Sequence, residues 1–165
     1  MRLLLLADTH VPQRARDLDP EVWQAIDDAD LVVHAGDWVS LDLLDRVEAR
    51  ADLLGCWGNN DHGQDFRARL PEVARREVEG VQVAVTHETG DKRGREARCD
   101  ARFEGTDLLV FGHSHVPWDS TTPGGIRLLN PGSCVDRRMQ PHRTYLTVEL
   151  SAGAIGEPVL HRLGT

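Results

Sequence analysis

Three short apolar runs in the first third of the chain alternate with segments of helical spacing, and this alternation constrains the fold most. The runs cover residues 3–7, 31–35 and 51–56, and each is typical of a strand buried on both faces. One helix is predicted to begin at Asp19-Pro20-Glu21 and a second after Ser40, because these residues are typical of helix starts. The order strand, helix, strand, helix, strand predicts a largely parallel sheet with crossover helices.

The second half of the chain is mainly β in character. Residues 73–78 and 81–85 flank Glu79-Gly80 and predict a hairpin, whereas residues 96–103 have the pattern of a helix. Further strands are predicted at residues 108–111, 126–129, 145–150 and 155–160. Both halves fit an α/β fold: a four-layer αββα sandwich of two mixed β-sheets flanked by helices, in a single domain over residues 1–165.

The composition is that of a globular protein, with 40% hydrophobic and 28% charged residues among 165. A net charge of −8 argues against non-specific binding of nucleic acid, which needs a basic surface. Cys56, Cys99 and Cys134 form no CxxC pair, which argues against a disulfide framework and fits a reducing compartment. The run at residues 3–7 is too short for a signal peptide or a membrane span, so we expect a cytoplasmic protein without membrane contact.

A polar cluster follows each of five predicted strands, at the point where the strand ends. Sites in sheets of this kind form outside the carboxyl ends of the strands. Two of the clusters place side chains at positions i and i+2, which point the same way on an extended segment. We therefore expect one site to be built from Asp8-Thr9-His10, Gly36-Asp37, Gly58-Asn59-Asn60-Asp61, His87 and Gly112-His113-Ser114-His115.

The candidate ligands in these clusters are carboxylates, imidazoles and one amide, with no thiolate. This donor set suits Mn²⁺, with Fe²⁺, Zn²⁺, Co²⁺ or Ni²⁺ as alternatives, better than Ca²⁺ or Cu⁺. Seven side chains are too many for one ion that must keep an open coordination position, so we predict two divalent ions that share a carboxylate. In two-metal hydrolases such ions lie about 3.5–4 Å apart and hold a hydroxide between them.

The five clusters, in this order, resemble those of the calcineurin-like metallophosphoesterases, and especially the small bacterial and archaeal phosphodiesterase branch. Asn130-Pro131-Gly132-Ser133 is similar to a further element of that branch, and the resemblance covers residues 3–150. It implies a two-sheet sandwich with outer helices, in agreement with the fold predicted above. It also implies that the two ions are bridged by Asp37, with Asp8, His10 and His115 on one ion and Asn59, His87 and His113 on the other.

Asn60 departs from the pattern of this family. Many members have a histidine there, which is credited with protonating the leaving group or stabilising charge on the phosphate, and the small branch often has cysteine. An amide cannot act as a general acid at neutral pH. We therefore expect an enzyme that favours good leaving groups, with Asn60 donating a hydrogen bond to a phosphoryl oxygen.

A basic segment begins five residues after His87 and contains Lys92, Arg93 and Arg95. Such a segment can reach the substrate as a phosphate clamp or lid. It can equally form a solvated loop and helix face, and the sequence favours neither interpretation. Substrate binding by these three residues is therefore one of two open hypotheses.

Other aromatic and histidine residues lie near the clusters or outside them. Trp38 and Trp57 can line the cleft and stack on a base or an aryl group, although core packing is expected for at least one of them. His34, inside an apolar strand, is expected to be a hydrogen-bonded core residue or to support a ligand. His62 is expected to be exposed at a helix start rather than to replace the missing acid, and surface positions are expected for His142 and His161.

The function predicted from these features is that of a metal-dependent hydrolase, a phosphodiesterase acting on a small phosphate ester. The alternatives are a phosphomonoesterase and a catalytically weak protein-binding scaffold with the same fold. The natural substrate, the physiological metal and the oligomeric state, homo-oligomers included, stay open at this point.

Overall fold

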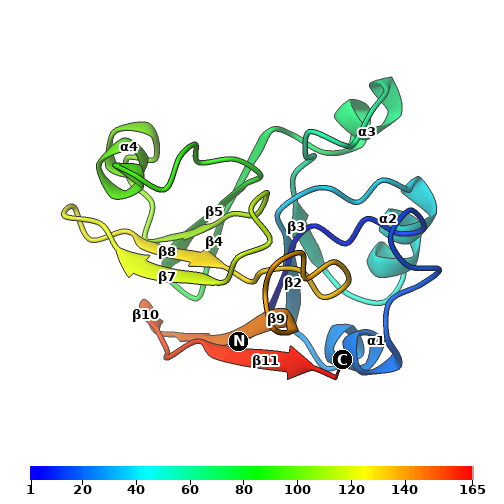
Figure 1. Cartoon of the computed structure of the whole chain (residues 1–165). Coiled ribbons are helices and arrows are strands. Elements are labelled where there is room, and N and C mark those ends of the chain that lie inside the picture. Colours follow the sequence, from blue (N-terminus) through cyan, green and yellow to red (C-terminus); the bar gives the residue numbers. More distant parts are fainter. Residues whose placement is uncertain (165) are drawn as a thin grey trace.

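Two mixed β-sheets form the centre of the molecule in the computed structural model, which describes residues 1–164 (Figure 1). The first sheet has six strands in the order β10-β9-β1-β2-β3, with β11 also paired to β9. The three strands predicted to be parallel are parallel, and β9 runs antiparallel beside β1. The strands are β1 (Arg2–Leu6), β2 (Leu31–His34), β3 (Leu53–Gly55), β9 (Arg143–Ser151), β10 (Ala154–Ile155) and β11 (Val159–Leu163).

The second sheet has five strands in the order β4-β5-β6-β8-β7. Its outer pairs, β4 with β5 and β7 with β8, are antiparallel, whereas β5, β6 and β8 are parallel. The β4–β5 hairpin turns at Glu79-Gly80, as predicted. The strands are β4 (Val73–Val78), β5 (Val81–Thr86), β6 (Leu108–Val110), β7 (Trp118–Thr121) and β8 (Arg127–Asn130).

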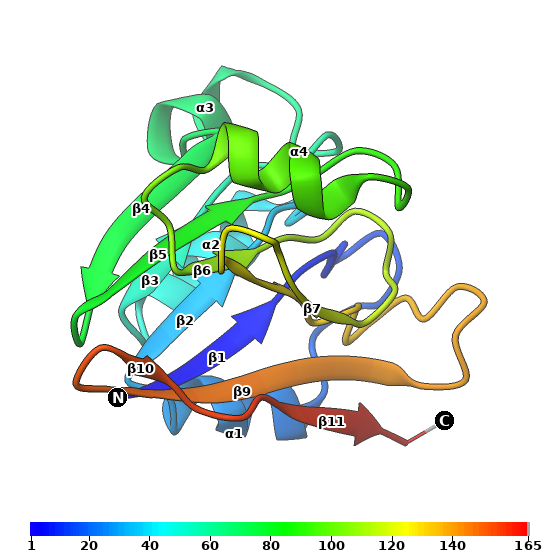
Figure 2. The ribbon, with the colours of Figure 1, turned by 90° about the vertical axis from the view of Figure 1, so that its left-hand side faces the viewer.

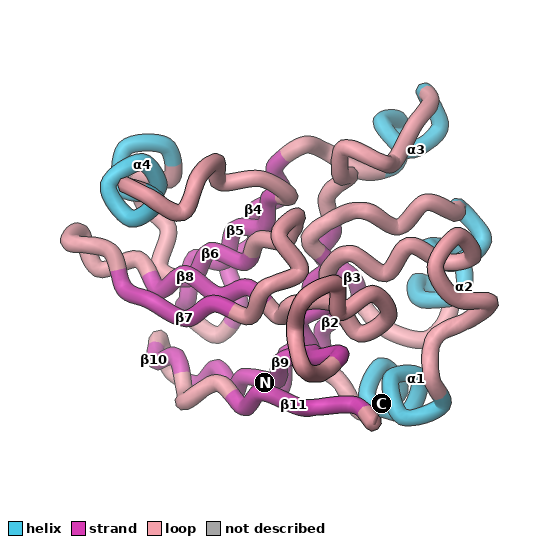
Figure 3. The backbone as a smooth tube through the Cα atoms, viewed as in Figure 1, coloured by secondary structure: helices cyan, strands magenta, loops and turns pink. Residues whose placement is uncertain are grey.

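Four helices lie at the outside of the strands (Figure 3): α1 (Pro20–Asp27), α2 (Leu41–Glu48), α3 (Gln64–Arg69) and α4 (Arg95–Arg102). The Ser40 hydroxyl caps α2 by accepting hydrogen bonds from the amides of Asp42 and Leu43. At α1 the start is set by Pro20, and the Asp19 carboxylate makes no cap; it pairs with Arg143 of β9 at 2.9 Å. Within residues 1–164, no helix has the length and apolar character to cross a membrane.

The alternation of side chains along each strand divides the interior into three apolar layers. In β1, Leu3 and Leu5 pack between the two sheets, whereas Leu4 and Leu6 pack against the helices α1 and α2. On the other side, β6 presents Leu109 to α4. Figure 2 shows α4 and α1 on opposite sides of the sheets. Burial on both faces explains the unbroken apolar runs and confirms the predicted αββα sandwich.

Three elements differ from the sequence-based expectation. Helix α3 is short and buries only Phe66, so it lacks a helical apolar repeat. Strand β7 is an edge strand whose side chains are alternately half-buried and exposed, without an apolar run. The strand predicted over residues 155–160 is divided into β10 and β11, because Pro158 has no amide hydrogen to donate to the ladder.

The layer between the sheets is expected to carry much of the stability. Val81 is fully buried there, whereas Val159 on β11 is 53% exposed. Val81→Ala should lower the free energy of unfolding by about 1.5–3 kcal/mol, and the matched Val159→Ala by less than about 0.5 kcal/mol. Urea unfolding measures both; equal losses would contradict this assignment of the core.

Candidate metal centre

The loops that follow β1, β2, β3, β5 and β6 meet at one end of the two sheets. The arrowheads of β1, β2 and β5 point toward the same side in Figure 2, so their carboxyl ends lie together. Backbone hydrogen bonds join the loops directly: the Asp8 amide donates to Gly36, the His10 amide to Asp37 and the Gly112 amide to His87, each at 3.0 Å. The predicted convergence of the five polar clusters is therefore present.

One half of the site is closed to solvent. The ligand atoms of Asp8, His10 and His115 lie within 4.8 Å of one another, and all three residues are buried. Asp8 Oδ1 lies 3.4 Å from His115 Nε2 and 4.0 Å from His10 Nε2. These are the three residues that the family resemblance assigns to one ion.

The other half of the site is open. Asn59 Oδ1 lies 2.8 Å from His87 Nε2 and 3.0 Å from His113 Nδ1, and both Asn59 and His113 are exposed. Asp37 Oδ2 lies between the two halves, 3.4 Å from His10 Nε2 and 3.5 Å from His87 Nε2. Asp37 thus lies between the two groups of side chains, and His113 lies with Asn59 whereas His115 lies with Asp8. The division of these residues between two ions stays a prediction.

Backbone carbonyls fix the tautomers of two histidines. His87 Nδ1 is 2.7 Å from the carbonyl oxygen of Ala35, and His115 Nδ1 is 2.6 Å from that of Asp136. A carbonyl only accepts, so in each neutral ring Nδ1 carries the proton and Nε2 presents its lone pair to the site. This arrangement orients metal-binding histidines in general.

Three buried polar atoms of the site have no hydrogen-bond partner: Asp8 Oδ2, His10 Nε2 and His115 Nε2. Burial lowers the pKa of His10; burial also acts on His115, but there the carboxylate of Asp8 outweighs it and raises the pKa. Leaving such atoms unpaired is costly unless something binds them. Carboxylate and imidazole atoms that face one another in this way fit divalent cations.

Five of the seven candidate ligands have a left-handed backbone: Asp8, His10, Asp37, His113 and His115, with φ between 45° and 70°. The expectation that Asp8 and His10, or His113 and His115, alternate along an extended segment is therefore wrong. Each left-handed non-glycine residue costs about 1–3 kcal/mol and persists only where its surroundings hold it. The side chains converge because strained turns aim them, which the i, i+2 spacing alone did not reveal.

A chain of hydrogen bonds through His34 joins the first two loops. The Gly36 amide donates to His34 Nδ1, so Nε2 of the neutral ring donates to the Thr9 hydroxyl at 3.1 Å, and that hydroxyl donates to the Asp37 carbonyl. Burial lowers the pKa of His34 well below its usual value, which keeps the ring neutral. Trp38 is fully buried and stacks on this ring at 3.5 Å. His34 is thus a hydrogen-bonded core residue, as predicted, and Trp38 belongs to the core.

Asp61 holds the loop after β2, a role that sequence reasoning missed although the residue belongs to one of the clusters. Its carboxylate accepts hydrogen bonds from the backbone amides of Asp37, Val39 and Gly58 at 2.7–2.9 Å. Burial raises its pKa, and these donors oppose that effect. Asp61 acts through the backbone of Asp37 and does not face the metal site itself.

Asn130 and Ser133 hold the remaining loops. The Asn130 amide nitrogen donates to the Gly112 carbonyl at 2.9 Å, and the Ser133 hydroxyl donates to the Asp8 carbonyl at 2.7 Å. The turn over residues 130–133 therefore positions the loops of Asp8 and His113.

The glycine of the third cluster is required for another reason, which is the close approach of two loops. A Cβ atom on Gly58 would lie 2.3 Å from Asp37 Oδ1.

Asn60 contacts the central carboxylate. Its side-chain nitrogen donates to Asp37 Oδ2 at 2.7 Å and its backbone amide to Asp37 Oδ1 at 2.8 Å. In this structure the side-chain amide of Asn60 donates to Asp37. Its expected contact with a phosphoryl oxygen stays a prediction.

The basic segment lies against aromatic rings. The Arg95 guanidinium is buried, 4.8 Å from the ring centre of Phe111 and 4.6 Å from that of Trp118, and Lys92 Nζ lies 5.3 Å from the latter. Arg93 is exposed. Substrate binding by these three residues stays a hypothesis.

Another arginine, Arg138, contacts a candidate ligand directly. Its guanidinium donates to the His113 carbonyl at 3.4 Å, and no pattern in the sequence marked this residue.

A pocket of about 240 Å³ opens beside the exposed half of the site. Trp57, half-buried, contributes to its wall together with Asn59 and His87, and the other lining residues are Glu72, Thr86, Glu88 and Arg102. This volume is below the range of roughly 300–1,000 Å³ typical of drug-sized ligands, so it suits one ring system. Of the two tryptophans, Trp57 is the one placed to meet a substrate.

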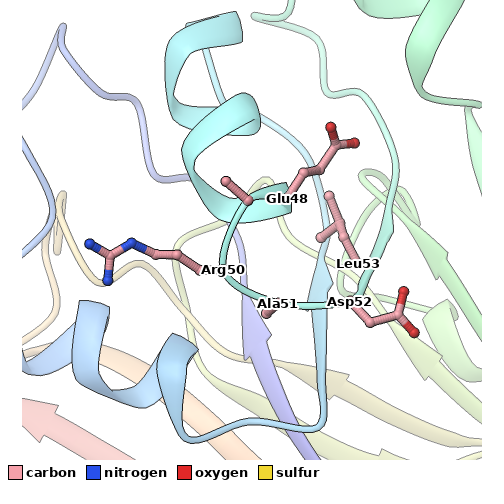
Figure 4. Close-up of a pocket in the computed structure, with 6 residues that line it drawn as sticks. Glu48, Arg50, Ala51, Asp52 and Leu53 are labelled. Atoms are coloured by element: carbon pink, nitrogen blue, oxygen red, sulfur yellow. The ribbon is translucent and has the colours of Figure 1, made fainter.

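A larger hollow of about 490 Å³ lies at the turn between α2 and β3 (Figure 4). It is at the amino end of β3, whereas the ligand clusters follow the carboxyl ends of the strands. Its three charged residues are all in ion pairs: Glu48 with Arg69, Arg50 with Asp27, and Asp52 with Arg76. Volume alone therefore does not make it the functional site.

The other histidines are not among the candidate ligands. His62 is exposed just before α3, as expected. His142 and His161 are half-buried rather than fully on the surface. His161 stacks on the ring of Tyr145 and shares a 2.8 Å hydrogen bond with the Thr147 hydroxyl.

Comparison with known proteins agrees with this site. Residues 1–153 match the family model of the calcineurin-like phosphoesterase superfamily domain. A probable metallophosphoesterase of Methanothermobacter thermautotrophicus is 32% identical over 152 residues, which cover 90% of this chain and 87% of that protein. The chain belongs to the calcineurin-like phosphoesterase superfamily, as the clusters predicted.

Solved structures show the same fold at lower identity. Vps29 of Entamoeba histolytica complexed with zinc has a TM-score of 0.77 and 20% identity, over 99% of this chain and 98% of that one. A structure described as a novel archaeal phosphodiesterase has a TM-score of 0.71 and 19% identity, over 98% of this chain and 100% of that one. Both structures share the fold of this chain over nearly its whole length.

The role of Asp61 can be tested by Asp61→Asn. An asparagine places a donor where the carboxylate accepts backbone N–H groups, so the variant should lose about 1–3 kcal/mol of unfolding free energy. It should also take up less Mn²⁺, because the backbone of Asp37 is no longer held. Asp91→Asn, in an exposed loop, is the matched control. Wild-type stability and Mn²⁺ content in Asp61→Asn, measured by urea unfolding and mass spectrometry, would contradict this role.

Proposed function

We propose that this protein is a dinuclear metal-dependent phosphoesterase that hydrolyses phosphodiesters. The observation that carries the proposal is the convergence of seven competent ligands, with buried, unpartnered atoms of Asp8, His10 and His115 facing one another. A protein interior does not tolerate such a cluster without a compensating charge. Membership of the phosphoesterase superfamily supports the same conclusion.

The ions would be held as the family resemblance implies: Asp8, His10 and His115 on the closed side, Asn59, His87 and His113 on the open side, and Asp37 between them. When bound, such ions lower the pKa of a coordinated water and neutralise charge on phosphoryl oxygens. The protein's own part is to fix the ligands. The carbonyls of Ala35 and Asp136 orient two imidazoles, and the Asp37 carboxylate accepts two hydrogen bonds from Asn60. Mn²⁺ is the proposed metal, because the donors combine oxygen and imidazole nitrogen without sulfur.

Two features favour diesters with a good leaving group. Asn60 offers no proton to a departing alkoxide at neutral pH. The pocket beside His87 and Asn59, with Trp57 in its wall, has room for a planar substituent of the substrate. The fold shared with an archaeal phosphodiesterase is compatible with this preference. We propose a small phosphate ester as substrate and the cytoplasm as location.

The alternatives differ in measurable ways. A phosphomonoesterase would hydrolyse aryl monoesters faster than the matching diesters. A protein-binding scaffold with the same fold would take up fewer than about one ion per chain after Mn²⁺ loading. The complete ligand set favours the enzyme over the scaffold.

The first test replaces the central carboxylate. Asp37→Asn keeps the size of the side chain but removes its charge, so we expect loss of bound Mn²⁺ and at least about a 100-fold fall in kcat/KM on an aryl phosphodiester. Asp65→Asn, at an exposed position of α3, is the matched control and should behave like the wild type. Full activity of Asp37→Asn would overturn the proposed function.

The second test restores an acid at position 60. Asn60→His should accelerate hydrolysis of alkyl diesters, which have poor leaving groups, more than that of nitrophenyl diesters, because a general acid contributes about 10²–10⁴-fold where protonation limits the rate. Asn60→Ala serves as control and should bring no such gain. If Asn60→His changes the rates for both classes of substrate equally, the absence of a general acid at position 60 does not determine the preference for good leaving groups.

A further inference from the structure

The open half of the metal centre is poor in charge compared with the closed half. Its own candidate ligands, Asn59, His87 and His113, offer an amide oxygen and imidazole nitrogens, which bring no negative charge, and its one carboxylate is Asp37, shared with the closed side. The closed half has Asp8 in addition. A divalent ion on the open side would therefore be neutralised less, and two of its ligands are exposed to water.

A further carboxylate lies at this open half. Glu88 Oε1 is 3.5 Å from His113 Nδ1, and the ligand atoms of His87, Glu88 and His113 all lie within 4.8 Å of one another. Among residues 1–164, His113 is the only basic side chain paired with this carboxylate. Arg102 is close, but its guanidinium donates to the Glu88 backbone carbonyl and pairs with the side chain of Glu72 instead.

The backbone around Glu88 is held in place. The preceding residue, His87, accepts a hydrogen bond from the Gly112 amide on its carbonyl. The following residue, Thr89, accepts two from the Arg98 guanidinium of α4 on its carbonyl, at 2.9 and 3.0 Å. The Glu88 side chain is about half exposed, but its backbone is thus held on both sides and its carboxylate lies beside His113.

We propose that Glu88 is an additional ligand of the ion on the open side of the site. This inference rests on the proposed function, because it needs the dinuclear centre. Glu88 supplies the negative charge that the neutral donors lack and raises the number of oxygen ligands. Oxygen ligands favour Mn²⁺ relative to Zn²⁺, which imidazole binds well. Glu88 thereby determines which metal the open half retains.

The test is a titration of the whole protein with Mn²⁺. Calorimetry and the electron paramagnetic resonance signal of free Mn²⁺ measure the binding. The wild type should bind two ions per chain. Glu88→Gln should weaken the weaker site at least about 10-fold and leave the tighter site unchanged, and Glu88→Asp should be intermediate. Glu72→Gln is the matched control, since Glu72 lines the same pocket but pairs with Arg102. In competition, Glu88→Gln should retain Zn²⁺ over Mn²⁺ more strongly than the wild type.

The outcomes separate this inference from the proposed function. If the wild type binds two ions and Glu88→Gln binds both with wild-type affinity, the role of Glu88 is overturned and the dinuclear centre stands. The same conclusion follows if Glu72→Gln weakens Mn²⁺ binding as much as Glu88→Gln. If the wild type binds no Mn²⁺, both proposals fail. Equal melting temperatures of the metal-free variants confirm that any loss is local, as expected for an exposed side chain.

Discussion

Asp37 is the point at which three loops are tied together, and the candidate metal centre depends on it. Its carbonyl accepts hydrogen bonds from the His10 amide and the Thr9 hydroxyl, and its amide donates to Asp61. Its carboxylate accepts both hydrogen bonds from Asn60. A left-handed backbone with φ 61° turns this carboxylate toward His10 and His87. Because one residue fixes the backbone and supplies the shared ligand, the two halves of the site cannot shift independently.

The rest of the fold brings these loops to the same place and keeps them there. The parallel strands β1, β2 and β3 are buried on both faces, so their carboxyl ends are fixed relative to one another. The second sheet packs its inner face on the first and delivers His87 and His113 across the interface. The strain of five left-handed residues is sustained by this rigid frame and by buried side chains such as His34 and Asp61.

The asymmetry between the two halves has a functional meaning. Asp8, His10 and His115 are closed to solvent, whereas Asn59 and His113 are exposed beside the pocket of Trp57. A catalytic metal centre needs an open side for its substrate and a fixed side that retains its ions. Glu88 stands on the open side, so the proposed metal ligand would also lie where the substrate enters.

The sequence by itself predicted the architecture and the candidate ligands. Apolar runs that are buried on both faces are visible without coordinates, and so is the position of a polar cluster after each run. Edge strand β7 and helix α3 were not predictable in this way, because neither has a continuous apolar pattern. Asp61 was visible as a residue, but its role depends on amides 22 and 24 positions away in the chain.

Only the tertiary structure decided how the ligands are aimed and what surrounds them. Side-chain direction at Asp8, His10, His113 and His115 follows from left-handed turns, which depend on contacts distant in sequence and therefore leave no local signal. The same holds for Glu88, which belongs to none of the clusters seen in the sequence and which the fold brings to 3.5 Å from His113. The hydrophobic pattern is a local property and can be read from neighbouring residues. The convergence of the ligands on one site depends on how the two sheets pack.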